Sequence, residues 1–436
     1  MIAENELIRP ETESRKMSAE EHIGSVIEKY KQYMNPGLAR LMQFGGFGDV
    51  EVSARGCVVT MASGTEYLDF VGGYGVFSLG HCHPRVIEAA KRQLDLMPLS
   101  TRTFFGEPQV LLAERLAQIA PGDLQYTFYS NSGAEAIEAA IKMARITTGK
   151  TDFISTIGAY HGKSMGALAA TGREKYRKPF EPMVPGFSHV PYNDLPAMAA
   201  AITERTAAIM IETIQGEGGI IVAEPGYIAG LRKLCDAHGL LLIADEVQTG
   251  LGRTGKMFGV NHDGIAPDIM CLAKALGGGV VPIGATMGTA QVWERTFGAN
   301  PLIHTSTFGG NPLACSAGIA SLEVIHDENL PARAVERGAQ LLAGLRAVQQ
   351  ELPGTLKEVR GLGLMIGVEF EVVDAAELTI NLMAGLGIIA AYTLNNPKVI
   401  RFEPPLIVTA GQIDRAVDAF RQSVSGAAAM LEGLEA

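Results

Sequence analysis

The stretch DIMCLAKALGGG, residues 268–279, places one lysine directly after a short apolar run and just before three glycines. The run from Ile269 to Ala273 has the pattern of a buried strand, so Lys274 lies where the chain leaves a dry interior. Burial there would lower the pKa of its ammonium group and free the amine as a nucleophile that can form a Schiff base. The alternative is a lysine that caps the strand end and extends into solvent. The remainder of the chain decides between these two interpretations.

Length and composition indicate a large globular protein. A chain of 436 residues exceeds what one simple core usually holds, so we expect one large unit and a smaller one. No apolar segment reaches the ~18 residues of a membrane span. The net charge is −11 and no basic run occurs, which argues against a nucleic-acid partner.

The cysteines and the first residues of the chain favour a cytoplasmic protein. Residues 1–16 are polar and acidic and lack the apolar core of a signal peptide. The five cysteines are odd in number and widely separated, which is typical of reduced thiols. The cluster His81-Cys82-His83 has no second pair of ligands and precedes Pro84, so a turn leading into a helix is favoured over a metal site.

The order of the expected elements divides the chain into three parts. Residues 1–72 combine a helical lead with a small meander of strands, and residues 331–436 combine helices and strands in a smaller α+β unit. Between them, residues 73–330 alternate apolar runs with helical stretches, which predicts a mostly parallel sheet covered by helices on both faces. The expected strands of this α/β part are Gln125–Tyr129, Phe153–Thr156, Ala208–Glu212, Leu240–Asp245 and Ile269–Lys274.

A turn of small residues follows the first of these strands and opens a helix. Ser132, Gly133 and Ala134 could hold a phosphate with their backbone N–H groups and the helix dipole, although an ordinary helix N-cap needs no ligand. Two nucleotide motifs nearly match elsewhere. The glycines of residues 250–255 are not followed by an apolar helical stripe, and the Walker-like loop of residues 158–164 is one residue short.

Asp245 ends a strongly apolar strand, 29 residues before Lys274. A carboxylate at the mouth of such a strand requires a cation, and the spacing equals about one strand–crossover–strand unit. The two side chains could form a structural ion pair. Together with the phosphate cradle, however, they are the three groups that hold the phosphate, the ring nitrogen and the aldehyde of pyridoxal 5'-phosphate.

Several ordered motifs make the sequence similar to one enzyme family. From about Tyr30 onward it resembles the class III (omega) aminotransferases, which belong to the fold type I pyridoxal-phosphate enzymes. The motifs are residues 131–135 (NSGAE), 160–162 (YHG), 215–219 (QGEGG), 244–250 (ADEVQTG), 272–274 (LAK), 307–312 (TFGGNP) and Arg401 before Glu403-Pro404-Pro405.

This resemblance implies a role for individual residues. Lys274 would carry the cofactor, Asp245 would pair with the ring nitrogen, and Tyr160 and Val247 would lie on opposite faces of the ring. The resemblance also places His161 and Gln248 at the cofactor, with Gln248 bonded to the ring hydroxyl. Many relatives have threonine where this chain has Ala134, which removes a hydroxyl but leaves the backbone donor. Thr307 would reach the phosphate in a neighbouring subunit, so the resemblance implies a homodimer, or a dimer of dimers, with shared sites.

Three further residues bear on the substrate. In the family, the arginine that matches Arg401 binds the carboxylate of glutamate or 2-oxoglutarate, and the glutamate that matches Glu217 pairs with it when a simple amine enters. Relatives acting on 4-aminobutyrate or acetylornithine generally have an arginine at the position of Lys163. Lysine lacks the planar pair of donors with which an arginine binds a second carboxylate. Residues 160–164 (YHGKS) instead look like those of the family's putrescine aminotransferases.

The resemblance therefore implies transfer of an amino group between a putrescine-like diamine and a 2-oxo acid. Ornithine, acetylornithine or 4-aminobutyrate remain alternatives for the amine, as does a biosynthetic aldehyde aminated in the reverse direction.

Overall fold

The computed structural model describes residues 17–435. Residues 1–16, which are expected to lack a signal peptide, lie outside this part. Within the described range, no helix combines the length and the apolar character that crossing a membrane requires.

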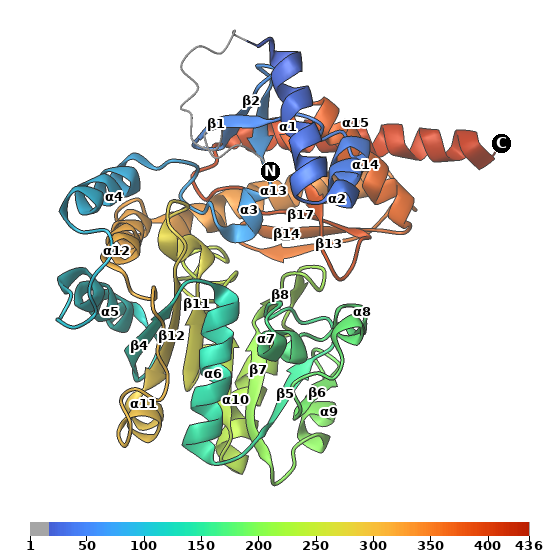
Figure 1. Ribbon diagram of the computed structural model, residues 1–436. Helices are drawn as coiled ribbons and strands as arrows, with labels where there is room; N and C mark the ends of the chain where they lie inside the picture. The colour runs from blue at the N-terminus through green and yellow to red at the C-terminus, as the bar shows by residue number, and fades with distance from the viewer. Residues whose placement is uncertain (1–16, 436) are drawn as a thin grey trace.

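A seven-stranded sheet forms the lower half of the molecule in Figure 1. Its strands are, in spatial order, β4 (Leu124–Ser130), β12 (Gly284–Thr289), β11 (Ile269–Leu272), β10 (Leu241–Asp245), β7 (Thr206–Glu212), β5 (Asp152–Thr156) and β6 (Phe187–Val190). The strands β11, β10, β7, β5 and β6 are parallel to one another, and β12 is antiparallel to both of its neighbours. The predicted mostly parallel sheet is confirmed.

Helices cover both faces of this sheet because successive strand residues point to opposite sides. Ala208, Met210 and Ile243 pack on one face, against α6 (Gly133–Thr148), with α7 (Met165–Ala170) and α11 (Ala290–Phe297) beside it. Ile209 and Leu242 pack on the other face. The helices of that second face are α9 (Leu195–Ala200), α10 (Tyr227–His238), α5 (Glu107–Ile119), α12 (Pro312–Asp327) and α4 (Pro84–Leu96).

The elements above this sheet come from both ends of the chain. One four-stranded sheet joins β1 (Glu51–Arg55), β2 (Val58–Met61), β3 (Glu66–Asp69) and β15 (Ile388–Ile389), and another joins β13 (Leu356–Leu362), β14 (Met365–Phe370), β17 (Val399–Phe402) and β16 (Ala391–Tyr392). The helices α13 (Leu330–Glu351), α14 (Val373–Gly385) and α15 (Ala410–Glu435) pack with them. Phe402 meets both Phe70 and Phe420 edge to face, which ties β17 to the chain after β3 and to α15.

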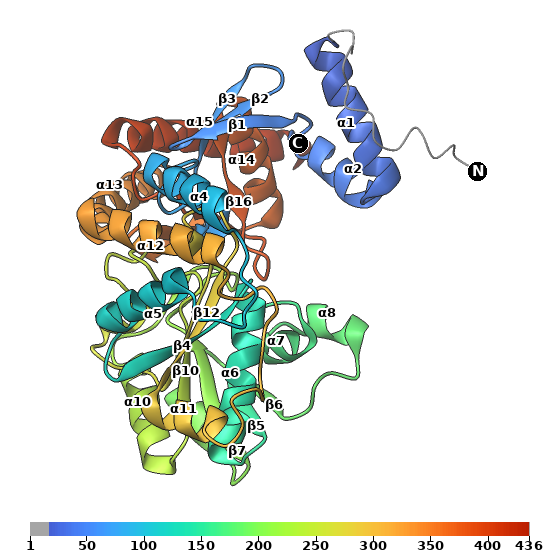
Figure 2. The ribbon, with the colours of Figure 1, turned by 60° about the vertical axis from the view of Figure 1, so that its left-hand side comes forward.

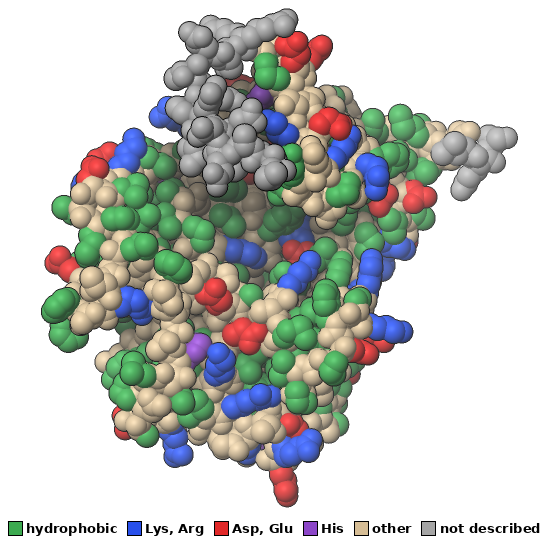
Figure 3. All heavy atoms as spheres, viewed as in Figure 1, with side chains coloured by type: hydrophobic (Ala, Val, Ile, Leu, Met, Phe, Trp, Pro, Cys, Tyr) green, Lys and Arg blue, Asp and Glu red, His purple; other side chains and the backbone are tan. Residues whose placement is uncertain are grey.

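The remaining elements of the described chain are helices, short 3-10 helices and two short strands. They are α1 (Ala19–Tyr33), α2 (Pro36–Phe44), α3 (Gly72–Gly75), α8 (Glu174–Arg177), the 3-10 helices η1 (Lys178–Phe180), η2 (Gly259–His262) and η3 (Lys274–Gly277), and the two-residue strands β8 (Ile214–Gln215) and β9 (Ile221–Val222). Figure 2 shows α1 and α2 at one edge of the molecule. The space-filling view shows a hollow where the lower sheet meets the elements above it (Figure 3).

Two local expectations need correction. The strand expected to run to Lys274 ends at Leu272, and Lys274 opens a 3-10 turn with a left-handed φ of 47°. The expected strands also omit β6 and β12, whose sequences FSHV and GATMGT lack a strong apolar run. The burial of β12 comes from its neighbours β4 and β11, and an isolated sequence window does not contain that information.

Candidate active site

Two cavities meet at Lys274 and Tyr160, which contribute to the lining of both. The first, of about 460 Å³, lies at the carboxyl ends of the strands of the seven-stranded sheet. The second, of about 650 Å³, lies between the first and helices α2 and α14. In an open parallel sheet the carboxyl ends of strands are the usual position for ligands. The position of Lys274 between two cavities argues against a lysine that merely caps a strand.

The conformation of Lys274 is held from several sides. The hydroxyl of Ser321 on α12 donates to the carbonyl of Ala275 at 2.8 Å, which anchors the turn. Gly75 lies beside the lysine stem and has a left-handed φ of 93°, which only glycine adopts without strain. Burial lowers the pKa of the Lys274 amine, while the carboxylates Glu403, Glu217 and Asp245 oppose that shift. An amine with a lowered pKa can act as a nucleophile or as a base.

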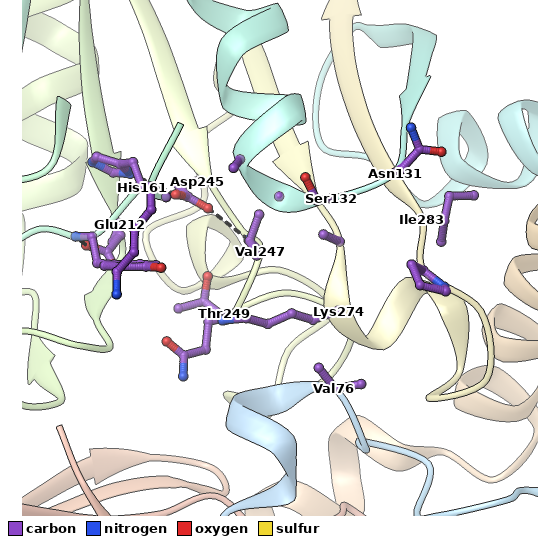
Figure 4. A pocket seen from close by; sticks show the side chains of 18 of the residues that line it. Val76, Asn131, Ser132, His161, Glu212, Asp245, Val247, Thr249, Lys274 and Ile283 are labelled. Carbon is purple, nitrogen blue, oxygen red and sulfur yellow. Dashed lines mark hydrogen bonds and ion pairs between the residues drawn. The ribbon is translucent and has the colours of Figure 1, made fainter. Parts of the chain in front are cut away.

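Asp245 is held by a chain of buried polar groups. Its Oδ2 lies 2.7 Å from Nδ1 of His161, whose Nε2 lies 3.2 Å from the hydroxyl of Ser155. Its Oδ1 accepts the backbone N–H of Val247 at 3.1 Å (Figure 4). Burial opposes charge on His161, but the contact with Asp245 outweighs it and raises the pKa of the imidazole. A carboxylate paired in this way stays oriented toward the cavity and suits a protonated ring nitrogen.

Glu212 is a site residue that the sequence analysis did not single out. It lies beside Asp245 across the β7–β10 pair, and its Oε2 accepts the backbone N–H of Tyr160 at 3.0 Å. Burial raises the pKa of Glu212 to about 7. Figure 4 shows Glu212, His161 and Asp245 gathered on one side of the cavity. The same signal that identified Asp245, a carboxylate at the end of an apolar strand, could have found it.

The start of α6 forms the opposite wall of the first cavity. The hydroxyl of Ser132 caps the helix by accepting the N–H of Glu135 at 3.2 Å, and Gly133 and Ala134 form the first turn. Gly133 packs closely on Val247, since a Cβ at Gly133 would lie 3.0 Å from a methyl group of that valine. The positive end of a 16-residue helix therefore faces the cavity, as a phosphate requires.

Gln248 lines the first cavity, but its amide is already engaged. Its Nε2 donates to both carboxylate oxygens of Glu403, at 2.9 and 3.0 Å. A Cβ at Gly216 would overlap Oε1 of Gln248, so any other residue there would force this amide to move. The sequence analysis quoted Glu403 only as a neighbour of Arg401 and assigned it no role.

Arg401 and Glu217 lie together in the wall of the second cavity, where their side chains form an ion pair. The guanidinium is fully buried, and its carbon lies 5.0 Å from the centre of the Tyr74 ring. Burial alone would raise the pKa of Glu217, but Arg401 holds it below its usual value. Nε and Nη1 of Arg401 have no hydrogen-bond partner among the described residues. Nη1 lies 3.5 Å from a carboxylate oxygen of Glu403, beyond a close hydrogen bond.

The last two predicted residues lie farther from Lys274. Lys163 is exposed at the rim of the first cavity, with its ammonium 5.3 Å from the centre of the Tyr176 ring. Thr307 is exposed and does not line either cavity within this chain. Its carbonyl accepts a hydrogen bond from Arg102 at 3.3 Å.

These features fit pyridoxal 5'-phosphate. The first cavity combines a helix N-terminus for the phosphate, a carboxylate held by histidine for the ring nitrogen, and the amine of Lys274 for the aldehyde. Val247 and Tyr160 contribute apolar surface that suits the faces of a ring.

Comparison with known proteins gives a consistent result. The family model described as aminotransferase class-III matches residues 49–424. The chain is similar to the ornithine aminotransferase of Toxoplasma gondii, in a structure with partial occupancy of PLP at the active site; identity is 32%, the TM-score is 0.87, and 96% of this chain and 99% of that one are covered.

Two further solved structures are similar over most of their length. A thermostable (S)-enantioselective omega-transaminase from Thermomicrobium roseum shares 30% identity at a TM-score of 0.87, covering 95% of this chain and all of that one. A transaminase from the marine bacterium Virgibacillus shares 29% identity at a TM-score of 0.88, covering 93% of this chain and all of the other.

Proposed function

Because the chain belongs to the class III aminotransferases, the family matched over residues 49–424, we propose that it transfers an amino group between a diamine such as putrescine and 2-oxoglutarate or another 2-oxo acid. Family membership makes it a pyridoxal-phosphate-dependent aminotransferase. The diamine and the identity of the 2-oxo acid are the proposed part.

Several residues that line the first cavity have a proposed task. When bound, pyridoxal phosphate supplies an aldehyde that takes up the amino group and a ring that accepts electron density from the substrate carbon. The first turn of α6, from Ser132 to Ala134, binds the phosphate, and Asp245 keeps the ring nitrogen protonated while His161 orients its carboxylate. Tyr160 and Val247 cover the faces of the ring.

Lys274 moves the proton. Lys274 lines both cavities, so with the cofactor and substrate bound its Nζ would remove a proton from the substrate carbon and deliver it to the aldehyde carbon of the cofactor. The lowered pKa of this amine makes it easier to deprotonate than an exposed lysine. Both half-reactions use the same space in turn, which predicts ping-pong kinetics.

The ion pair between Arg401 and Glu217 is the observation that supports dual specificity. When Glu217 contacts Arg401, it neutralises the positive charge of the guanidinium beside Lys274, and the site accepts an amine that lacks a carboxylate. With Glu217 displaced, the guanidinium of Arg401 can bind the carboxylate of a 2-oxo acid as a fork.

The outer walls of the cavities support a diamine as the amino donor. Lys163 lies at the rim of the first cavity. Its ammonium group lacks the planar pair of donors of an arginine, so it is less suited to bind a second substrate carboxylate through two hydrogen bonds. On the far wall of the second cavity, α14 contributes the carboxylate of Glu377 and the amide of Asn381. Such groups suit a second ammonium group.

Ornithine, acetylornithine and 4-aminobutyrate remain the alternative donors, and the similarity to an ornithine aminotransferase favours the first of these. A biosynthetic transaminase that aminates an aldehyde is a further alternative, because the same site works in both directions.

We also propose that the active unit is a homodimer. Thr307 lies on the surface close to large exposed apolar side chains, those of Leu302, Ile303 and Phe308. A second subunit would cover this surface and receive Thr307 at its own cofactor phosphate. Sedimentation of the purified protein measures the state directly, and a stable monomer would contradict the proposal.

The substrate is tested with the holoenzyme in separate half-reactions. Putrescine, cadaverine, ornithine, acetylornithine and 4-aminobutyrate are each added without a 2-oxo acid, and the loss of the cofactor's visible absorbance is followed. The proposal expects the diamines to react with the highest kcat/KM. A preference for 4-aminobutyrate or acetylornithine would overturn the interpretation of Lys163.

A further inference from the structure

Glu403 is a buried acid with an unusual set of neighbours. Its side chain is fully buried at the end of β17, and one oxygen lies 3.5 Å from Nη1 of Arg401. Both oxygens accept the amide of Gln248. Glu403 therefore joins the arginine of the second cavity to a residue that lines the first.

The position of Glu403 is rigid. Its backbone N–H donates to the carbonyl of Phe70 at 2.8 Å, and two prolines, Pro404 and Pro405, follow it. Gly72 packs directly on its carbonyl, since a Cβ at Gly72 would overlap that oxygen. Glu217 has a side chain that is 13% exposed and borders the cavity. Of the two carboxylates beside Arg401, only Glu217 borders a cavity, where its Oε2 also accepts the backbone N–H of Leu394 at 2.7 Å.

Several buried charges surround Arg401. Its guanidinium faces two carboxylates, both of which also act on the amine of Lys274, and Glu403 in addition acts on the buried guanidinium of Arg253. When Glu217 moves away for a 2-oxo acid, Glu403 still neutralises much of the charge of Arg401. When Glu217 stays in place, two carboxylates face Arg401, and its attraction for a further anion is weakest.

We propose that Glu403 is a specificity-determining residue: a fixed counter-charge that weakens the attraction of Arg401 for carboxylates and makes the site favour cationic amines that lack one. This inference rests on the proposed function, because it concerns the choice between the two substrate classes of that site. It differs from the movement of Glu217 in being permanent, so it acts in both half-reactions.

The charge of Glu403 is removed with Glu403→Gln, which has nearly the same shape. In the holoenzyme, binding of glutarate, an unreactive dicarboxylate, is measured by calorimetry. Removing one anion beside a buried guanidinium should tighten glutarate binding on the order of tenfold. The kcat/KM for putrescine should fall while that for 2-oxoglutarate rises or holds.

A spectroscopic measurement separates this electrostatic role from a structural one. Glu403 has the largest effect among the anions that favour a protonated nitrogen on Lys274. In Glu403→Gln, the pH titration of the cofactor's visible absorbance should therefore have a lower midpoint than in the unchanged enzyme. Glu403→Asp, which keeps the charge, should keep the original midpoint and the original substrate preference.

The chain offers a matched control. Arg360 is also buried and also contacts two carboxylates, Glu358 at 2.7 Å and Glu369 at 2.6 Å, but none of the three lines either cavity. Glu369→Gln should lower the melting temperature without changing glutarate binding or the absorbance midpoint. If Glu403→Gln does not fold, Glu403→Ala removes the same charge without adding an amide, and the same directions are expected.

The outcomes distinguish the two proposals. Unchanged glutarate affinity and an unchanged midpoint in the folded Glu403 variants would overturn the role of Glu403, whatever the amine. If the Glu403 variants bind glutarate more tightly but the unchanged enzyme does not react with diamines, the role of Glu403 as a counter-charge is supported and the diamine proposal fails.

Discussion

Replacing Arg401 with alanine should separate the two half-reactions. The guanidinium is fully buried beside Lys274, so a carboxylate bound to it would be desolvated. Truncating one partner of such a pair costs ~2–5 kcal/mol. At ~1.4 kcal/mol for each tenfold change, kcat/KM for 2-oxoglutarate should fall by roughly 30- to 4,000-fold. An amine without a carboxylate does not use this contact, and its kcat/KM should fall by less than ~tenfold.

The assay is single-turnover reaction of the holoenzyme, with the amine and the 2-oxo acid measured separately by absorbance. The substitution also removes one ion-pair partner of both Glu217 and Glu403, which destabilises the fold by ~3–5 kcal/mol. The melting temperature is therefore measured first, and the assay is run well below it. Glu217→Gln is the matched control, because it frees Arg401 and should leave 2-oxoglutarate use intact. Equal losses in both half-reactions of Arg401→Ala would refute the assignment.

Three other outcomes follow from the geometry. Lys274→Ala should lose the visible absorbance of the lysine-bound cofactor and nearly all activity; a variant that keeps both would rule out this lysine. Glu377→Gln should raise the KM for putrescine by about tenfold while leaving that for butylamine unchanged, because only the diamine carries a second charge toward α14; similar shifts for both amines would contradict a second ammonium site. The third outcome concerns pH. Burial raises the pKa of Glu246 from 4.5 to about 7, so ionising it disfavours the folded state and its destabilising effect grows as pH rises through that range. The difference in the free energy of unfolding between Glu246→Gln and the unchanged protein should therefore shift in favour of the variant by up to ~3 kcal/mol from pH 4.5 to pH 8. At every pH the variant also loses stability, because its amide replaces the carboxylate that accepts the N–H groups of Gly259 and Val260. Urea titrations at several pH values measure the free energy of unfolding of both proteins. If the difference between them does not change with pH, Glu246 stays ionised in the folded protein.

Much of the architecture follows from local patterns along the chain. Strands such as β7 and β10 are continuous apolar runs, and helix α6 begins at a serine cap. Such signals are local, because burial on both faces of a parallel strand and capping of a helix each leave their mark within a few residues. The placement of Asp245 and Lys274 near the ends of two neighbouring strands was predictable for the same reason.

The contacts that tune the site are not local. Glu212 and His161 approach Asp245 from other strands and loops, and Glu403 reaches Gln248 across 155 residues of sequence. The backbone of Lys274 turns out of its strand because α12 holds the following carbonyl. Sequence motifs identify the chemical groups, since each group lies within a short segment. Their charge states and their partners depend on the packing of distant segments, because burial and neighbouring charges set the pKa of each group and only the folded chain brings those neighbours together.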